Sequence, residues 1–182
     1  MRKDGFTLIE LMVVIAILAI LIGMLIPGVG VIMDKAKNST ARTGAIVVQT
    51  ALQRYRTEYN VWPEFAKGSS KTHYTDDEFM ETMAPDPTDK KPPKGNLKRI
   101  VFIETSEGAA ATTSSGKLKY LDPWGKPFQY LVNETPKDTM KLGSFKGDYK
   151  GATEIRAKVL VWSAGDDGDY TTWDDNIYSW AD

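Results

Sequence analysis

The chain has 182 residues, of which 42% are hydrophobic and 26% charged, and this length allows one membrane segment and one domain of about 120 residues. Its 23 basic and 24 acidic residues give a formal net charge of -1, so there is no electrostatic case for nucleic-acid binding. The absence of cysteine excludes a disulfide framework, a thiolate nucleophile, a lipoprotein anchor and a cysteine-based zinc site.

The first element is an apolar run over residues 6–27 that contains one charged side chain, Glu10. As a helix, Phe6 to Ile26 would span roughly 31 Å, close to the ~30 Å hydrocarbon core of a bilayer. A carboxylate there costs on the order of 2.5–3.5 kcal/mol at the membrane centre and less near an end. Glu10 therefore either lies at the level of the lipid headgroups or has a partner. The run is too long for a secretory signal peptide, so a retained membrane helix is expected.

The helix is expected to continue beyond the membrane over residues 28–60. Pro27, Gly28 and Gly30 predict a kink or local melting near 26–30, because proline removes a hydrogen bond and glycine weakens a helix. Asn60 is typical of a helix end. Spacings of four and three residues mark one apolar face, which predicts packing on a soluble domain: Ala41, Ala45, Val48, Leu52, Tyr55 and Tyr59.

Residues 64–97 are expected to form a variable connection. Thr75 and Glu78 fit a capping box, which predicts a short helix at about 75–84. The proline- and charge-rich residues 84–96, "APDPTDKKPPKGN", predict a surface loop. The only histidine, His73, has no cysteine partner, and it is expected on the surface rather than as a ligand or a base.

Three runs have strand character and predict a small antiparallel sheet on the helix: residues 99–104, 128–132 and 155–162. Phe128, Tyr130 and Val132 should share one face. Ile155, Ala157, Val159 and Val161 should do the same. Residues 108–116, "GAAATTSSG", predict a flexible loop.

The N-terminal residues "GFTLIEL", after a short basic leader, closely resemble the signal of type IV pilins and type II secretion pseudopilins. The resemblance implies cleavage by a prepilin peptidase between Gly5 and Phe6, and N-methylation of Phe6. It also implies that the leader is cytoplasmic and that the chain after Pro27 lies outside the cytoplasm.

The resemblance also suggests a role for Glu10. After cleavage, the amine of Phe6 could approach the Glu10 carboxylate of an adjacent subunit, and opposite charges at short range favour both ionised forms. Such a pair in lipid need not be net stabilising, so its main effect would be to set the register between subunits. Glu10 is therefore expected to specify assembly.

Residues 121–130, "LDPWGKPFQY", are similar to a signature of the major pseudopilins. Asp122 can form an Asx turn, Gly125 permits a positive φ and Trp124 is expected as a buried anchor. The stretch thus predicts a structural turn that leads into a strand, and Asp122 is not a candidate catalytic acid.

The last twenty residues contain six aspartates and no lysine or arginine. Composition alone leaves a solvated acidic loop and a calcium site equally open, because hard oxygen ligands suit Ca²⁺. The resemblance to the major pseudopilins favours calcium and implies Ile177 and Trp180 as the apolar anchor of the loop. It implies the ligands Ser163, Asp167, Asp174 and Asn176, with Asp166, Asp169 and Asp175 as less certain ones.

These features predict an α+β fold like that of type IV pilins, with a long N-terminal helix packed on a small antiparallel sheet. The expected segments are a leader (1–5), a transmembrane helix (6–27), an amphipathic half-helix (28–60) and a globular domain (61–182). That domain would contain a variable loop (64–117) and the acidic calcium loop (163–180).

The resemblance implies a major pseudopilin of a type II secretion pseudopilus, a single-pass inner-membrane protein with its C-terminal domain in the periplasm. Its implied partners are copies of itself, minor pseudopilins, the prepilin peptidase and an inner-membrane assembly platform with a cytoplasmic ATPase. The alternatives are a type IV pilin of a surface filament, for adhesion, motility or DNA uptake, and a solitary signal-anchored calcium-binding domain. An anchored hydrolase is disfavoured, because the chain lacks G-x-S-x-G and H-E-x-x-H motifs, so no enzymatic activity is expected.

Overall fold

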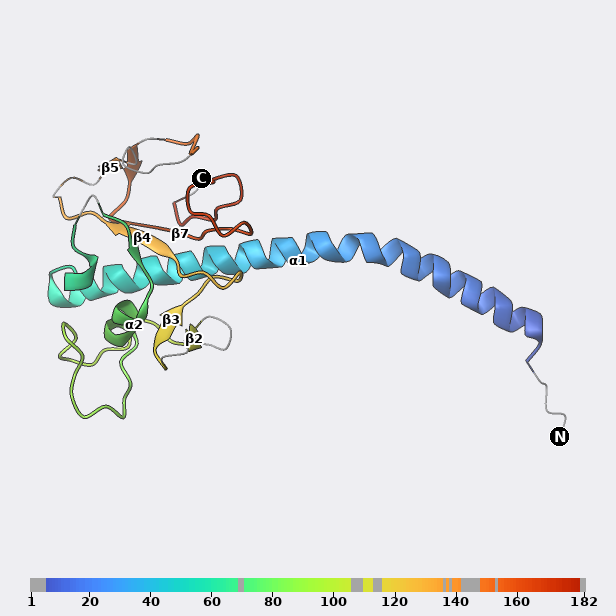
Figure 1. Cartoon of the computed structure of the whole chain (residues 1–182), viewed down its shortest axis with the longest axis horizontal. Helices are drawn as coiled ribbons and strands as arrows, with labels where there is room; N and C mark the ends of the chain where they lie inside the picture. The colour runs from blue at the N-terminus through green and yellow to red at the C-terminus, as the bar shows by residue number, and fades with distance from the viewer. Residues whose placement is uncertain are drawn as a thin grey trace. The chain divides into compact units, whose positions relative to one another are not determined.

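The structure, a computed structural model, describes residues 6–68, 71–105, 110–112, 116–135, 137, 139–141, 148–152 and 154–180, with the backbone alone at 24–29 and 110–112. Its elements are α1 (Leu8–Tyr59), η1 (Glu64–Ala66), β1 (His73–Tyr74), α2 (Asp77–Met83), β2 (Ala110–Thr112), β3 (Leu118–Tyr120), β4 (Gln129–Val132), β5 (Thr139–Lys141), β6 (Glu154–Arg156) and β7 (Val159–Trp162) (Figure 1). The chain divides into two compact units between Lys37 and Asn38.

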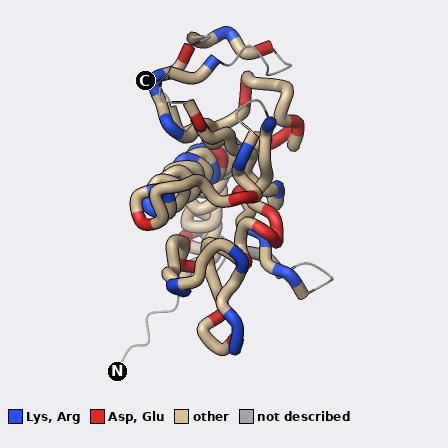
Figure 2. The backbone as a smooth tube through the Cα atoms, turned by 90° about the vertical axis from the view of Figure 1, so that its left-hand side faces the viewer, with Lys and Arg blue, Asp and Glu red and all other residues tan. Residues whose placement is uncertain are grey.

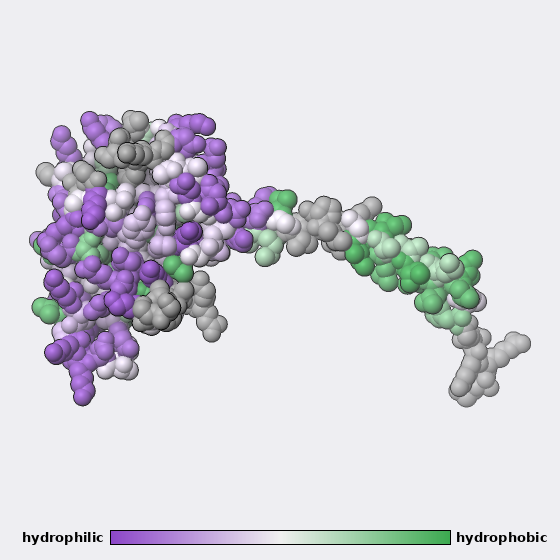
Figure 3. Space-filling model, in the orientation of Figure 1, coloured by the Kyte–Doolittle hydropathy of each residue, from purple (hydrophilic) through white to green (hydrophobic). Residues whose placement is uncertain are grey.

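The first unit contains the N-terminal part of α1. Every side chain from Phe6 to Gly23 is exposed, and the space-filling view shows a largely hydrophobic surface there (Figure 3). Among the described residues, no helix combines the length and the apolarity required of a membrane-spanning candidate.

Helix α1 is continuous over 52 residues. The local melting expected near 26–30 is not found, since proline removes only one hydrogen bond and a long helix propagates cooperatively around it. The expected end is confirmed, because the helix stops at Tyr59 and Asn60 adopts a left-handed φ of 57°.

In the second unit, the residues that follow α1 pack on one face of the C-terminal half of that helix. The predicted apolar stripe is confirmed, since its members from Ala41 to Tyr55 are at most 3% exposed and Tyr59 packs against the same core. The stripe contacts residues of α2, β4 and β7 in one hydrophobic cluster.

A three-stranded antiparallel sheet with the order β1-β4-β7 lies at the centre of this unit. Both β4 and β7 are buried on their two faces. Tyr130 and Val161, which are directly paired, belong to the core on α1, whereas the next pair, Leu131 and Leu160, belongs to a second core with Trp173. The α+β arrangement with an antiparallel sheet is thus confirmed.

Two strand predictions need correction. Residues 155–162 do not form one strand: β6 pairs with β5, while β7 pairs with β4, so Ile155 and Ala157 pack on the second core instead of the first. Residues 99–104 do not form a strand, because the N–H groups of Phe102 and Ile103 both donate to the carbonyl of Met83 at the end of α2. Of the expected loop 108–116, residues 110–112 form β2, and 108–109 and 113–115 lie outside the described residues.

The predicted capping box of α2 is wrong by one residue. Asp76 is the N-cap, and its Oδ1 accepts from the N–H of Phe79 at 3.1 Å. The hydroxyl of Thr75 instead donates to the Tyr120 carbonyl at 2.5 Å and accepts from the Phe128 N–H at 2.9 Å. Thr75 therefore joins the start of α2 to β3 and to the residues that precede β4.

Gly44 provides a test of the packing between α1 and the sheet, since a Cβ there would lie 2.7 Å from the ring of the buried Phe128. We expect Gly44→Ala to lower the free energy of unfolding by about 1–3 kcal/mol, despite the better helix propensity of alanine. A Cβ at Gly30 meets nothing within 4 Å, so the control Gly30→Ala should be neutral or stabilising by up to about 1 kcal/mol. Urea denaturation of the purified chains measures both, and equal effects would contradict the packing.

Candidate functional site

Glu10 lies in the first turn of α1 and takes part in capping that end of the helix. Its Oε2 accepts from the Thr7 N–H at 2.8 Å and from the Thr7 hydroxyl at 2.6 Å, while the Glu10 N–H approaches the Thr7 hydroxyl oxygen at 3.4 Å. This is a capping box, and a carboxylate also favours the positive end of the helix dipole. The T-x-x-E spacing of Thr7 and Glu10 is the signal in the sequence for this contact. The predicted cleavage pair is described in part: Phe6 is exposed and Gly5 lies outside the described residues.

The turn at residues 121–127 has the predicted geometry. The Asp122 Oδ1 accepts from the N–H groups of Trp124 and Lys126 at 3.1 and 2.8 Å, and Gly125 has a φ of 85°. Asp122 is buried, and this burial raises the pKa of its carboxyl. Trp124 is only half-buried, so the expectation of a buried anchor is wrong: the tight turn itself fixes this segment.

The acidic loop, residues 163–180, follows β7 and returns beside it. The Ser163 N–H donates to the Ile177 carbonyl at 2.8 Å, and the Ser179 N–H donates to the Val161 carbonyl at 2.8 Å. A bridge between Trp162 and Tyr178 lies between these contacts. The backbone therefore brings the two ends of the loop together.

One acidic side chain, that of Asp175, turns into the loop, whereas the side chain of Asp167 is exposed. The Asp175 Oδ2 accepts from the Asp167 N–H at 3.0 Å. Asp175 also occupies the space at Gly165, where a Cβ would lie 2.6 Å from its carboxylate and where φ is 65°. The residue at 165 must therefore be glycine for two reasons, its backbone conformation and its close contact with Asp175.

The neutral oxygens of the predicted set are buried in the same loop. The Ser163 hydroxyl accepts from the Gly165 N–H at 3.0 Å. Asn176 is 4% exposed, and its Nδ2 donates to the Tyr170 carbonyl at 3.3 Å. Its Oδ1 is buried and has no hydrogen-bond partner among the described residues. A buried amide oxygen without a partner is costly, and it is available to a cation.

The other acids of the predicted set lie elsewhere. The side chain of Asp174 is 84% exposed and lies 3.8 Å from the ammonium of Lys150, and Asp166 is also exposed. The Asp169 carboxylate accepts from the N–H and hydroxyl of Thr171, which lower its pKa. Within the described part of the chain, no group of three or more histidine, cysteine or carboxylate side chains is placed to hold a metal. The structure thus brings Ser163, Asp175 and Asn176 together with the backbone N–H of Asp167, and it leaves Asp174 outside.

An aromatic cluster that the sequence analysis missed covers the inner side of the acidic loop. The ring centroid of Trp173 lies 5.8 Å from that of Trp162 and 5.9 Å from that of Trp180. The backbone N–H of Trp173 donates to the Asp148 carboxylate at 2.8 Å. Trp180 packs on this core, as its predicted role as an apolar anchor requires. Four aromatic residues within residues 170–180 were the available signal.

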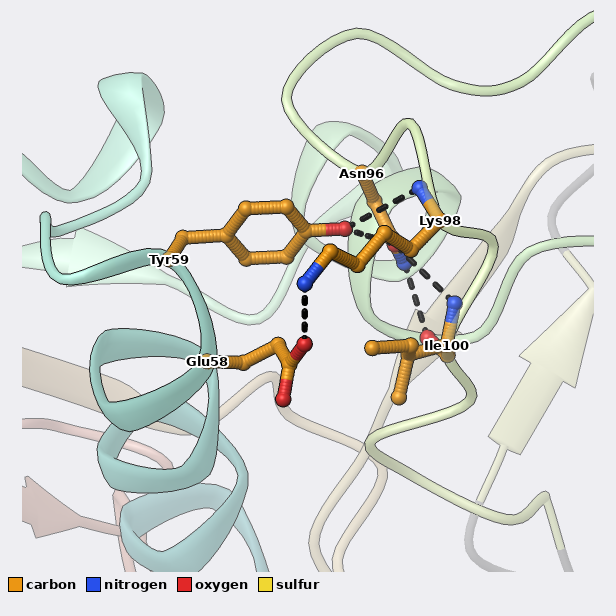
Figure 4. A network of polar contacts seen from close by, with 5 residues as sticks. All are labelled: Glu58, Tyr59, Asn96, Lys98 and Ile100. Carbon is orange, nitrogen blue, oxygen red and sulfur yellow. Dashed lines mark hydrogen bonds and ion pairs between the residues drawn. The ribbon is translucent and has the colours of Figure 1, made fainter.

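The region 84–100 is fixed to the end of α1 by Asn96, a fully buried polar residue (Figure 4). Its Oδ1 accepts from the Tyr59 hydroxyl at 2.8 Å and from the Ile100 N–H at 3.0 Å. Its Nδ2 donates to the carbonyls of Thr82 and Ile100, both at 2.8 Å. Next to it, the Lys98 ammonium pairs with Glu58 at 2.5 Å. The predicted surface loop is thus held at its base by a buried polar side chain.

Comparison with known proteins agrees with the two sequence signatures. Residues 1–26 match the family model of the prokaryotic N-terminal methylation motif. The type II secretion system core protein G of Pseudomonas aeruginosa is 32% identical over 165 residues, which cover 88% of this chain and 96% of that protein. The chain belongs to the type II secretion system core protein G family.

Other relatives support this assignment. The core protein G of Vibrio cholerae is 32% identical over 172 residues, which cover 91% of this chain and 97% of that protein. The type IV major pilin protein PilA of Myxococcus xanthus is 38% identical, but over only 65 residues, or 36% of this chain and 30% of that protein. No solved structure matches the chain. The core protein G family thus accounts for nearly the whole length, whereas the pilin accounts for a third.

His73, which was expected on the surface, is half-buried in β1 and stacks on Tyr130 with 5.6 Å between ring centroids. Burial lowers the pKa of His73, and the charge of Lys71 lowers it further. The structure therefore gives His73 a packing role at the edge of the sheet.

This environment predicts a pH effect on stability. Since the folded pKa lies below the ordinary value of about 6.5, the unfolded chain binds the proton first as the pH falls. The stabilisation is present above about pH 6.5 and is lost as the pH falls through the folded pKa. We expect the unfolding free energy to fall more between pH 7.5 and 5.5 in the wild type than in His73→Gln. Parallel urea-denaturation profiles of the two chains would contradict the burial effect.

Proposed function

We propose that this chain is the repeating structural subunit of a type II secretion pseudopilus, and that it acts mechanically in protein export. The observation that carries the proposal is the similarity to core protein G along nearly the full length. The exposed apolar side chains between Phe6 and Ile22 support it, because such a surface needs either lipid or other subunits as a partner.

In this proposal α1 lies first in the inner membrane and later in the filament. It anchors the precursor in the inner membrane, with the domain after residue 37 in the periplasm. After the peptidase has cut behind Gly5, an assembly platform driven by an ATPase moves the subunit into the filament, where the same apolar surface packs on neighbouring helices. Minor pseudopilins would be further partners. No step needs catalysis by this chain.

Glu10 would then change partners during assembly. In the single chain, its carboxylate accepts from Thr7 of the same helix. The amine of Phe6, created by cleavage, would be available to Glu10 of an adjacent subunit, and a cation is a stronger partner for a carboxylate than a hydroxyl. Docking would therefore favour one register between subunits.

The second candidate is a type IV pilin of a surface filament, which is favoured by the 65-residue similarity to PilA. Imaging of a tagged subunit separates the two functions. A pseudopilin at native expression gives secretion without long surface filaments, whereas a pilin gives surface filaments and leaves secretion unchanged when it is deleted.

We further propose that the acidic loop binds calcium, as expected from the family resemblance. The chemistry of the donors supports this, since the loop offers the inward carboxylate of Asp175 with the buried oxygens of Ser163 and Asn176, and the exposed carboxylate of Asp167 belongs to the same loop. Bound calcium would supply positive charge that neutralises the two carboxylates and ties the C-terminal segment to β7 in a chain without disulfides.

The role of Glu10 is tested by Glu10→Ala in cells that carry the secretion system. We expect normal membrane insertion and cleavage but an about tenfold loss of filament, which corresponds to about 1.4 kcal/mol per subunit contact. The matched control is Thr7→Ala, which removes the capping hydroxyl and keeps the carboxylate, so it should assemble nearly normally. An equal loss in both variants would assign the effect to helix capping.

The calcium proposal is tested by thermal unfolding with excess calcium or with a chelator. At a calcium concentration of about 100 times Kd, we expect the midpoint to rise by about 5–10 °C, and magnesium should not replace calcium. Asp175→Asn should abolish the shift and Asp174→Asn should retain it. An unchanged midpoint in the wild type would refute calcium binding, and loss of the shift in Asp174→Asn alone would refute this choice of ligands.

A further inference from the structure

The second unit has loops of opposite charge near the two ends of its part of α1. The lysine loop, residues 86–95, lies at the C-terminal end of the helix, where the Tyr55 hydroxyl donates to the Gly95 carbonyl at 2.7 Å. The acidic loop, residues 163–180, contains five aspartates and no lysine or arginine. The backbone view marks the basic and acidic positions (Figure 2).

Contacts along the helix place the two loops at different levels. Gly168 of the acidic loop lies against Lys126, two residues from Phe128, and the Phe128 ring meets the helix at Gly44. The lysine loop is joined to the helix through Asn96 and Lys98, which contact Tyr59 and Glu58. The 14 residues from Gly44 to Glu58 correspond to about 21 Å along a helix. One loop is therefore displaced from the other along the helix axis.

Hydrogen bonds within the chain restrain the lysine loop. The Arg99 guanidinium donates to the Asp89 carbonyl at 2.5 Å, and the Asp86 carboxylate accepts from the N–H and hydroxyl of Thr88 at 2.8 and 2.7 Å. Pro92 and Pro93 fix φ directly after Lys91. Because these contacts and the two prolines restrain the backbone, less backbone entropy is lost when the side chains of the loop bind a partner.

Lys90 and Lys91 of this loop are available for contact with a partner. Lys90 and Lys91 are exposed, and neither forms an ion pair with a described residue, whereas the neighbouring Lys98 does. These two adjacent cations at the end of the domain have no evident role in the fold of a single chain.

The acidic loop has matching anions. Asp166 and Asp174 are exposed, whereas the Asp175 carboxylate turns inward and accepts from the Asp167 N–H. The contact of Asp174 with Lys150 is long, at 3.8 Å, and both side chains are more than 80% exposed, so water or another cation can replace it. The outward pair of aspartates is thus separate from the oxygens that would hold calcium.

We propose that Lys90 and Lys91 of one copy of this chain dock on Asp166 and Asp174 of the next copy. The two surfaces differ and lie at opposite ends of the domain, so the contact is heterologous and leaves a free surface of each kind at the two ends of the assembly. Such a contact extends into a filament instead of closing a dimer. Solvent-exposed charge pairs chiefly set orientation and register. The inference rests on the proposed function and names the surface through which the domains would contact each other.

The chain has no cysteine, so introduced cysteines report contacts without background. In the full-length chain, assembled in cells with the secretion system, Lys91→Cys with Asp174→Cys should give a disulfide-linked ladder of dimers, trimers and larger species. Each single variant can give dimers only. A bond within one chain needs Cα atoms within about 7 Å and gives no ladder.

The matched control is Lys67→Cys with Asp174→Cys, which places an exposed cysteine on a different loop. We expect at least tenfold less ladder from this pair. Equal ladders from both pairs, dimers alone, or cross-links only to other proteins would overturn the proposal.

Charge reversal gives an independent measurement. The double variant Lys90→Glu with Lys91→Glu should reduce the filament yield severalfold. The double variant Asp166→Lys with Asp174→Lys should have the same effect. The chain that carries all four changes should recover the filament yield. Loss without recovery in the four-fold variant would contradict direct pairing. If the wild type itself forms no filament, the proposed function fails; if the wild type assembles and the reversed chains assemble equally well, only this inference fails.

Discussion

The packing of one face of α1 on β4 and β7 is the interaction on which the rest of the domain depends. The close contact between Gly44 and Phe128 allows the sheet to approach the helix, and the paired Tyr130 and Val161 fill the interface. Both strands are buried on their two faces, so the face that points away from α1 packs on a second core, which is rich in aromatic residues. The apolar side chains of α1 from Leu8 to Ile22 take no part in this interface and are exposed.

The polar features are attached to this framework at its ends. Asn96 fixes the region 84–100 to Tyr59, and the backbone of β7 fixes the acidic loop through Ser163 and Ser179. Both loops are therefore positioned by buried contacts, while Lys90, Lys91, Asp166 and Asp174 remain in solvent. This division explains how a small domain can present opposite charges in fixed places.

Periodicity and short motifs predicted the features that depend on residues close together in the sequence. The stripe of α1, its end at Asn60 and the turn at Asp122 depend on neighbours within a few residues, and each was predicted. The predictions failed where distant groups competed for the same atoms. Thr75 binds Tyr120 instead of capping α2, and Phe102 donates to Met83 instead of a strand partner. Local patterns do not report such competition, because the alternative partner is far away in the sequence.

The sequence alone determined the class of protein, the long helix with its buried face and the chemical type of the C-terminal loop. These properties follow from composition, spacing and short motifs, which are independent of how the chain folds back on itself. Only the tertiary structure decided which aspartates turn inward, since Asp174 and Asp175 are adjacent and chemically identical. The return of the loop beside β7 and the glycine at 165 direct one carboxylate inward and leave the other in water.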